Sequence, residues 1–377
     1  MKIYLYLKHF PPDGNNLIDG PSKSTHGFAS GLVACGEEVT ILCERQTPSS
    51  FQTNTGYKIE CFANPHEKLT FKIADSLKQY ISDKIEKTSI VIINGLFHPG
   101  VYSVSRILKK YSIPYIMSPR SVYHPSLFWK NPHIKWPYWY LFEKKMLKQA
   151  KALQLQDSRQ AQWLKPLGVE TPVIEVPNGF FTEDMPSESS LKWHQNETPK
   201  LFFFGRIDAN HKGLDLLFDA LAQMDERENT KLVLQGSDGG DRINLEQKAK
   251  ELSISEKVSF LEPDYHNSAS SIIAKYDIFC LPSRFEGFAN SGLEAMAAGR
   301  VLLVSETSGN APHVQASGCG VVVKPEVSSI KEGLIELIQR RSEWQKMGLK
   351  GRKYVIEYLN WHNIAATTLK HYQVLYR

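Results

Sequence analysis

Several features that would assign a class to a chain of this length are missing from the sequence. No stretch of about 18 apolar residues occurs, so no segment is expected to span a membrane. The apolar start Met1–Leu7 is too short for a signal peptide, and polar Lys8 and His9 follow it. Cysteine is scarce, no C-x-x-C pair occurs, and Cys43 and Cys280 lie in apolar runs. We therefore expect reduced, buried thiols in a cytoplasmic protein, located in the cytosol or at the inner face of the membrane.

Motifs of other classes are missing as well. The sequence has no G-x-S-x-G elbow and no H-E-x-x-H pattern, which disfavours a serine hydrolase and a zinc protease. The net charge of +5 is small for 377 residues, and no nucleic-acid-binding signature occurs. We expect anionic ligands or a lipid surface rather than a nucleic acid as the partner.

Short apolar, β-branched runs alternate with helical patterns along the whole chain. Such continuous apolar strands are typical of parallel sheets covered by helices on both faces. Two successive sets of about six strands predict an α/β chain with two Rossmann-like domains, with ligands at the carboxyl ends of the strands and a cleft between the domains. The runs are Lys2–Leu7, Glu38–Cys43, Ser89–Asn94, Pro114–Ser118, Ala152–Gln156, Val173–Pro177, Lys200–Gly205, Lys231–Gly236, Val258–Pro263, Ile278–Pro282, Val301–Glu306 and Gly320–Pro325.

A glycine-rich turn with two carboxylates follows the strand predicted at Ile278–Pro282. Glu286 and Glu294 lie eight positions apart, across a turn that opens a helix. Backbone N–H groups at a helix start favour a phosphate, and flanking carboxylates can accept hydrogen bonds from sugar hydroxyls. This combination suits a sugar nucleotide better than ATP or NAD. A surface-loop role for Glu286 remains an alternative, and Ser291-x-x-Glu294 also reads as a capping box.

Two cations follow the first strand of the second half. Gly205 and Arg206 end that strand, and Lys212 precedes a glycine at a helix start. Arginine and lysine beside a glycine turn can neutralise a diphosphate. The alternative is a pair of solvated side chains on an ordinary loop.

Together these segments resemble the retaining GT-B glycosyltransferases of family 4. The resemblance covers most of the chain and implies an acceptor domain at 1–182, a donor domain at 183–360 and a final helix at 361–377 that crosses back to the first domain. The matching elements are Ser118-Pro119-Arg120, Pro177-Asn178-Gly179, Gly205-Arg206 through Lys212-Gly213, Glu286 through Glu294, and Leu359-Asn360-Trp361.

The resemblance also implies a role for each matched residue. Arg206 and Lys212 would hold the donor diphosphate, Glu286 would contact the donor sugar, and Glu294 would bind the ribose. Further donor contacts would come from Gly20, Asn178, Gly205, Gly287, Phe288, Ala289, Asn290 and Ser291. The main departure is Asn94, which stands where many members have a histidine. His98 and Arg120 are the other acceptor-side candidates.

The implied reaction retains anomeric configuration and uses the departing β-phosphate as base, so no side-chain nucleophile, cofactor or metal is needed. The absence of a D-x-D pair argues against the metal-dependent GT-A class. The co-substrate would be a nucleotide-diphosphate sugar, and the acceptor a polysaccharide or lipid-linked oligosaccharide. Two alternatives remain open: a sugar-nucleotide hydrolase or epimerase, and a non-catalytic sugar-nucleotide-binding partner.

Aromatic residues alternate with lysines over Trp129–Lys148. This pattern suits contact with an anionic bilayer or a lipid-linked acceptor. The alternative is a core helix with its aromatic face inward and its lysines in water.

Overall fold

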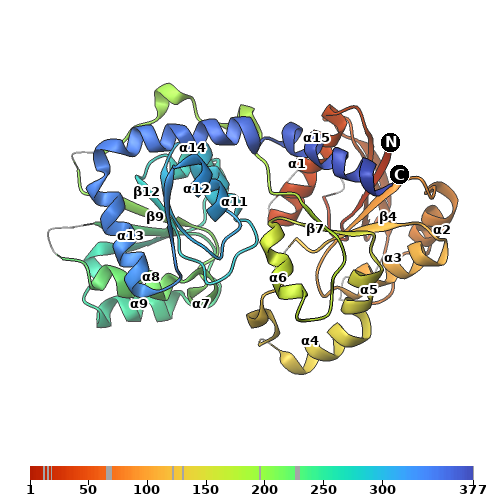
Figure 1. Cartoon of the computed structure of the whole chain (residues 1–377), viewed down its shortest axis with the longest axis horizontal. Coiled ribbons are helices and arrows are strands. Elements are labelled where there is room, and N and C mark those ends of the chain that lie inside the picture. Colours follow the sequence, from red (N-terminus) through yellow and green to blue (C-terminus); the bar gives the residue numbers. More distant parts are fainter. Residues whose placement is uncertain are drawn as a thin grey trace. The chain divides into compact units, whose positions relative to one another are not determined.

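The computed structural model of the chain describes residues 1–11, 13–14, 17, 19–64, 70–120, 123–129, 131–194, 197–225 and 230–376. Contacts divide the chain into two compact units, which Figure 1 colours along the sequence. Unit 1 comprises Met1–Gly179 and Trp361–Arg377, and unit 2 comprises Phe180–Asn360. The sequence places the boundary nearby, at 182/183. Each unit has its own sheet and helices, so the α/β class expected from the sequence is confirmed.

The described residues of unit 1 form an eight-stranded sheet in the order β3-β4-β2-β1-β5-β6-β7-β8. The strands that follow β1 in the chain, β2 to β4, lie on one side of it in the sheet. The strands from β5 to β8 lie on the other side. The elements are β1 (Lys2–Tyr6), α1 (Gly20–Ala34), β2 (Glu38–Arg45), β3 (Ser49–Gln52), β4 (Lys58–Ala63), α2 (Asp75–Lys84), β5 (Ile90–Asn94), α3 (Pro99–Lys110), β6 (Tyr115–Ser118), α4 (Pro132–Tyr138), α5 (Lys144–Gln149), β7 (Ala152–Leu155), α6 (Ala161–Leu164) and β8 (Val173–Glu175).

Two strands at the edge of this sheet are not predicted by the sequence. β3 is exposed along its length and pairs antiparallel with β4, whereas the other paired strands of the sheet are parallel. β4 carries Lys58 and Glu60 between its apolar residues. The expectation of about six parallel strands is therefore wrong for unit 1, because an edge strand needs no continuous apolar run.

The described part of unit 2 forms a six-stranded parallel sheet in the order β11-β10-β9-β12-β13-β14. Each of the six runs predicted here contains a strand. The elements are β9 (Lys200–Phe204), α7 (Ala209–Lys212), α8 (Leu214–Ala222), β10 (Lys231–Gln235), α9 (Arg242–Glu251), β11 (Val258–Leu261), α10 (Ala269–Ile273), β12 (Ile278–Leu281), α11 (Asn290–Ala297), β13 (Val301–Ser305), α12 (Ala311–Ser317), β14 (Gly320–Val323), α13 (Val327–Gln339) and α14 (Trp344–Tyr358).

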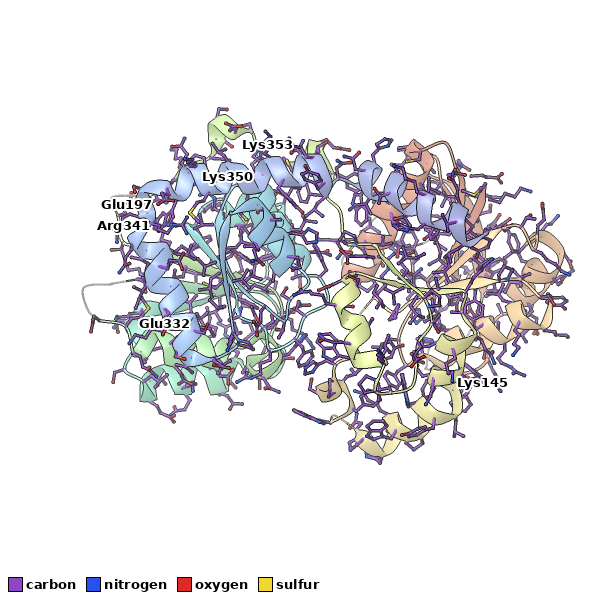
Figure 2. The ribbon with its side chains drawn as sticks, viewed as in Figure 1. Lys145, Glu197, Glu332, Arg341, Lys350 and Lys353 are labelled. Atoms are coloured by element: carbon purple, nitrogen blue, oxygen red, sulfur yellow. The ribbon has the colours of Figure 1, made fainter. Side chains whose placement is uncertain are left out.

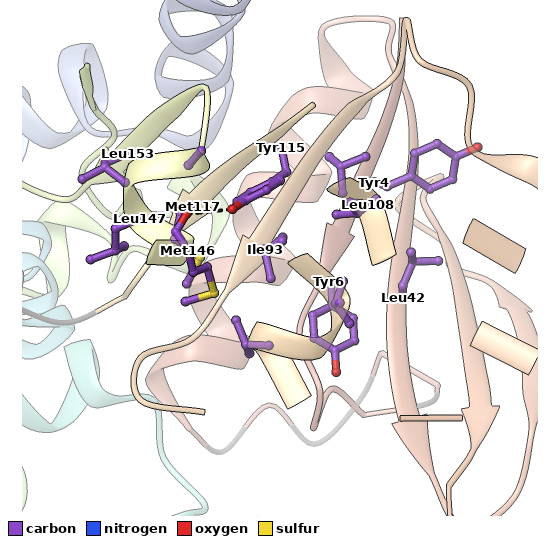
Figure 3. Close-up of a cluster of buried hydrophobic side chains, with 14 of the residues drawn as sticks. Tyr4, Tyr6, Leu42, Ile93, Leu108, Tyr115, Met117, Met146, Leu147 and Leu153 are labelled. Carbon is purple, nitrogen blue, oxygen red and sulfur yellow. Dashed lines mark hydrogen bonds between the residues drawn. The ribbon is translucent and has the colours of Figure 1, made fainter. Parts of the chain in front are cut away.

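The central strands of both sheets are buried on their two faces. In β9, Phe203 packs into one core cluster with Leu334 of α13, whereas its neighbour Phe202 packs into another with Leu293 of α11. In unit 1 a corresponding cluster includes Tyr115, whose hydroxyl donates to the Met146 carbonyl at 2.7 Å (Figure 3). This two-sided burial explains why the strands are continuous apolar runs.

Charged side chains lie on the outer surfaces of the helices. Lys145 on α5, Glu332 on α13 and Lys353 on α14 are exposed examples (Figure 2). Over the described residues, no helix is both long enough and apolar enough to cross a bilayer.

The last helix, α15 (Trp361–Leu375), packs on the first helix of unit 1. The two lie side by side in Figure 1, although they come from opposite ends of the sequence. A Cβ added to Gly27 of α1 would lie 2.0 Å from Cε2 of Trp361. Only a residue without a side chain lets the indole lie this close to α1. α15 thus packs closely on α1, through the contact of Trp361 with Gly27.

Gly27→Ala is expected to destabilise unit 1 by about 1–3 kcal/mol, because the new methyl group must displace the buried Trp361 indole. Chemical denaturation followed by tryptophan fluorescence measures the change. Lys23→Ala, on the exposed face of the same helix, is the matched control and should shift the free energy of unfolding by less than about 0.5 kcal/mol. Equal stability of Gly27→Ala and the wild type would contradict the tight fit.

Candidate active site

The charged motifs of unit 2 lie where its strand order reverses. β9 and β12 are parallel neighbours, but the chain continues from β9 toward one edge of the sheet and from β12 toward the other. Loops that follow such a pair open a crevice in which ligands of α/β sheets bind. Arg206 follows β9 and Glu286 follows β12, so the topology brings these two motifs to one place.

A direct backbone contact fixes the two loops against each other. Gly213, between α7 and α8, has a left-handed φ of 66°, and a Cβ there would lie 2.1 Å from the Pro282 carbonyl oxygen. A glycine is therefore required at this position. Gly205, at the end of β9, donates its N–H to the Gln235 carbonyl at 3.0 Å and anchors the loop to β10.

Lys212 and Glu286 form an ion pair between their Nζ and Oε2 atoms. Their side chains are only 15% and 14% exposed. Burial alone would raise the pKa of Glu286, but the Lys212 ammonium and His211 outweigh it, and the pKa lies below its ordinary value. Glu286 is therefore an ionised hydrogen-bond acceptor at neutral pH. A lysine ammonium has three donors, so Lys212 can hold Glu286 and still donate to a phosphate.

Arg284 is a positioning residue that sequence reasoning does not identify. Its guanidinium binds both carboxylate oxygens of Asp215 at 2.7 Å, and its backbone N–H donates to the His211 carbonyl at 3.0 Å. Bidentate pairs of this kind fix geometry as well as charge. The only signal in the sequence is the position of Arg284, two residues before Glu286.

Arg206 is the most exposed of the charged site residues. Its side chain is 54% exposed and lies 3.3 Å from Asp208, which caps α7 by accepting the His211 N–H at 2.9 Å. The guanidinium contacts Asp208 and still remains open to solvent. It is thus placed to contact an anionic ligand from outside the sheet.

The helix after the glycine-rich turn begins differently from the sequence expectation. α11 starts at Asn290, and its N-cap is Ala289, whose methyl side chain cannot accept a capping hydrogen bond. The interpretation of Ser291 and Glu294 as a capping box is therefore wrong, because Ser291 already lies inside the first turn. Instead, the buried Asn310 side chain accepts the Ala289 N–H at 2.8 Å and donates to the Ala289 carbonyl at 3.1 Å.

The other donor-side candidates of unit 2 lie around this turn. Gly287, Phe288 and Ala289 are buried, whereas Asn290, Ser291 and Glu294 are half-buried on α11 or at its start. Asn310, which holds the turn, is not predicted because it is distant in sequence and carries no motif. It is part of the β13–α12 loop, and the fold alone brings it here.

Unit 1 places Asn94 and Arg120 in one hydrogen-bonded group. Asn94 is 1% exposed; its amide donates to the Tyr6 carbonyl at 3.1 Å, and its oxygen accepts the Arg120 Nε–H at 2.8 Å. Arg120 has a left-handed φ of 57°, and burial lowers the pKa of its guanidinium to about 10. The Asn94 amide therefore links β1, β5 and the loop after β6.

The remaining candidates of unit 1 lie at or near the ends of helices or strands. His98 caps α3, with Nδ1 accepting the Gly100 N–H at 3.1 Å. Gly20 is the first residue of α1, which Asp19 caps. In the loop before Gly20, Pro12, Asn15, Asn16 and Ile18 lie outside the described residues. Asn178 is buried and accepts a 2.8 Å hydrogen bond from Gln156.

A buried carboxylate that sequence reasoning passes over, Glu143, lies against the loop after β5, at Phe97. Glu143 Oε1 accepts hydrogen bonds from the Tyr123 hydroxyl at 2.6 Å and from the Phe97 N–H at 3.1 Å. Burial raises the pKa of Glu143 to about 7, against the opposing effect of these hydrogen bonds. Its signal in the sequence is a lone carboxylate directly after the aromatic run Trp139–Phe142.

Two Rossmann-like units, with a charged site at the strand-order reversal of the second, define a protein of the two-domain GT-B class. The chain matches the family described as "Glycosyl transferases group 1" over residues 188–354 and the "Glycosyl transferase 4-like domain" over residues 19–179. The chain therefore belongs to the group 1, GT4-type glycosyltransferase family, as the motifs predict.

Known proteins resemble the chain in sequence and in structure. An uncharacterized glycosyltransferase of Methanocaldococcus jannaschii is 31% identical over 48% of this chain and 46% of its own length. The phosphatidyl-myo-inositol mannosyltransferase of Mycobacterium tuberculosis is 25% identical over 54% of each chain. The matches thus span about half the length of these curated relatives.

Solved structures match over the whole chain. The sucrose-phosphate synthase of Thermosynechococcus elongatus has a TM-score of 0.75 at 17% identity and covers 100% of this chain and 99% of its own. The Anabaena protein HepE, solved in complex with UDP, has a TM-score of 0.72 at 14% identity and covers 99% and 100%. These similarities establish the GT-B fold.

The raised pKa of Glu143 predicts that the stability of unit 1 depends on pH. The native state keeps a proton that the unfolded state loses, so the free energy of unfolding should fall as pH rises from about 4.5 to about 7. Glu143→Gln keeps a neutral side chain and should remove this part of the pH dependence. Thermal midpoints measured from pH 4.5 to 8 test this, with the exposed Glu256→Gln as control. An unchanged pH profile in Glu143→Gln would contradict the assignment.

Proposed function

We propose that the protein is a retaining, metal-independent glycosyltransferase that moves a sugar from a nucleotide-diphosphate sugar to a hydroxyl of a polysaccharide or lipid-linked oligosaccharide. The observation that carries this proposal is the grouping of Arg206, Lys212 and Glu286 where the strand order of unit 2 reverses. The group offers two cations and one ionised acceptor within a single crevice of the fold.

The two cations match the charge that develops in the reaction. Breaking the anomeric C–O bond leaves negative charge on the departing phosphate and positive charge on the sugar. Arg206 and Lys212 would stabilise the phosphate, most strongly in the transition state. The leaving β-phosphate would take the proton of the acceptor hydroxyl on the same face, so anomeric configuration is retained without a side-chain nucleophile.

The remaining donor contacts follow from the chemistry of the turn. Glu286, held ionised by Lys212, would accept hydrogen bonds from donor-sugar hydroxyls, and Glu294 would accept them from the ribose. Backbone groups of Gly287 through Ser291 would line the sugar and phosphates, with Gly205, Gly20 and Asn178 as further contacts. The structural relative HepE is known with UDP, which supports a nucleotide diphosphate as the ligand.

On the acceptor side, Asn94 is less suited to contact a sugar than the sequence implies. Its amide is already bonded to Tyr6 and Arg120, so the proposed acceptor contacts fall to His98 and to the Arg120 guanidinium. The similarity to a phosphatidyl-myo-inositol mannosyltransferase favours an acceptor that carries or resembles a lipid headgroup.

Contact with the inner face of the membrane through Trp129–Lys148 is part of the proposal. Trp139 is buried, as a core helix requires, but Trp129 is 74% exposed and Leu141 63% exposed. Lys145 is exposed on the following helix (Figure 2), whereas Lys130 lies outside the described residues. Exposed aromatic and apolar side chains beside lysines fit the interface of an anionic bilayer.

Lys212→Met is expected to lower kcat roughly 10²- to 10³-fold, because it removes a donor to the leaving phosphate. Lys248→Met, which breaks the Lys248–Asp219 pair elsewhere in unit 2, is the matched control and should keep wild-type turnover. Sugar transfer, free-sugar release and nucleotide binding are measured on the same preparations with UDP-, GDP- and ADP-sugars. Release without transfer would favour a hydrolase, and binding alone a non-catalytic partner.

Leu141→Glu is expected to weaken binding to vesicles of anionic phospholipid at least about tenfold, since burying a large apolar side chain contributes about 1.5–3 kcal/mol. Cosedimentation with vesicles measures the partition. Ile243→Glu alters an exposed apolar residue of α9 in unit 2 and should leave binding unchanged. Equal binding by wild type and Leu141→Glu would exclude this segment as the membrane contact.

A further inference from the structure

Unit 1 has its own reversal of strand order, between β1 and β5. The two strands are parallel neighbours, and the chain continues from them toward opposite edges of the sheet. The crevice at their carboxyl ends is thus a second position where the fold favours a ligand. Lys8 follows β1 there, and His98 follows β5.

Lys8 is a buried cation without a partner in the described part of the chain. It is 3% exposed, and its Nζ makes no hydrogen bond among the described residues. A buried ammonium is expensive unless an opposite charge or hydrogen bonds compensate it. A neutral side chain at position 8 would therefore make the folded protein more stable than Lys8 does, unless a ligand supplies the negative charge that Lys8 lacks.

Glu44 and Asp19, the two carboxylates that act on the neighbouring His9, are committed to other groups. Glu44 accepts hydrogen bonds from the Tyr6 hydroxyl at 2.7 Å, from the Ala74 N–H at 3.1 Å and from Asn64. Asp19 accepts both the N–H and the hydroxyl of Ser22 at 2.8 Å to cap α1. Neither forms an ion pair with Lys8 among the described residues.

His98 supplies a second unpaired donor. Because its Nδ1 accepts the Gly100 N–H, the proton of the neutral ring is on Nε2. Nε2 is buried and has no hydrogen-bond partner among the described residues. Burial, with Lys8 and His9, lowers the pKa of His98 to about 4, so the ring is neutral at pH 7 and Nε2 is a donor.

Both donors reach the start of α3, a helix of 12 residues. A Cβ placed on Gly100 would lie 3.5 Å from Lys8 Nζ and 3.3 Å from His98 Cε1. The first turn of a helix carries partial positive charge and favours an anion. The Lys8 ammonium and the His98 ring therefore lie together at the N-terminus of α3.

We propose that Lys8 Nζ and His98 Nε2, at the N-terminus of α3, form an oxyanion site that binds a phosphate or carboxylate group of the acceptor. The assignment to the acceptor rests on the proposed function, in which the donor diphosphate is held by Arg206 and Lys212 of unit 2. The acceptor of this enzyme is thus an anionic glycan or a phosphate-bearing headgroup rather than a neutral sugar.

The test is binding of small anions to the full chain, followed by NMR of ¹³C-labelled histidine rings. Inorganic phosphate, glucose 6-phosphate and glucuronate are titrated, with glucose as the neutral probe, and Lys8→Met, His98→Gln and Lys2→Met are compared with wild type. Lys2 lies at the other end of β1, on the surface, and pairs with Glu86, so Lys2→Met is the matched control.

Phosphate and the better of the two anionic sugars should shift the ring signal that His98→Gln removes. Lys8→Met should weaken this binding at least tenfold, and Lys2→Met should not. The thermal midpoint of Lys8→Met should equal or exceed that of wild type, because an unpaired buried charge is removed, so lost binding is not lost folding. An unmoved His98 signal, equal affinity in Lys8→Met, or glucose binding as tight as glucose 6-phosphate would each overturn the proposal.

UDP and GDP titrations separate the two sources of a phosphate. If they shift the His98 signal and lose the same affinity in Lys8→Met, the site belongs to the donor and the acceptor assignment is overturned. Nucleotide binding that depends on Lys212 but not on Lys8 supports it. Phosphate binding at Lys8 without any nucleotide binding would refute the donor site of the proposed function and leave the oxyanion site standing.

Discussion

The parallel pairing of β9 with β12 is the constraint on which the charged site of unit 2 depends. Because the strand order reverses between them, the loops at their carboxyl ends meet with no third strand to separate them. The contact of Gly213 with the Pro282 carbonyl sets their separation, and the Arg284–Asp215 pair sets their orientation. The ion pair of Lys212 with Glu286 exists only because these contacts bring two distant segments together.

Both units have a lysine at the point where the strand order reverses, but only the lysine of unit 2 has a carboxylate partner among the described residues. In unit 2 the partly buried lysine has a carboxylate partner, and the pKa of that carboxyl is lowered as a result. In unit 1 the buried Lys8 has none among the described residues, and the pKa of His98 beside it is lowered instead. An unpaired buried ammonium lowers the stability of the fold unless an anion compensates its charge, whereas a paired one already has its counter-charge. The buried Lys8 therefore lowers the stability of unit 1 at the position where the fold favours a ligand.

Local patterns in the sequence predict most of the fold. The continuous apolar runs are strands because both faces of each sheet are covered, and this same burial makes them easy to recognise. β3 and β4 escape prediction because an edge strand with exposed residues has no such pattern. The capping interpretation of Ser291 fails for a related reason. The spacing fits a capping box, but Asn310, from a different loop, holds the turn, and the N-cap of α11 is Ala289, two residues before Ser291.

The sequence by itself determined the α/β class, the family and the identity of the motif residues Arg206, Lys212, Glu286 and Glu294, because these depend on short-range order along the chain. Only the tertiary structure decided which side chains are paired, buried or left without a partner. It joined Lys212 to Glu286 and committed Asn94 to Tyr6 and Arg120. Within the part of the chain that the structure describes, it left Lys8 Nζ and His98 Nε2 without a hydrogen-bond partner. The physical reason is that charge compensation and desolvation depend on what surrounds a group in space, and those neighbours come from strands and loops far apart in the sequence.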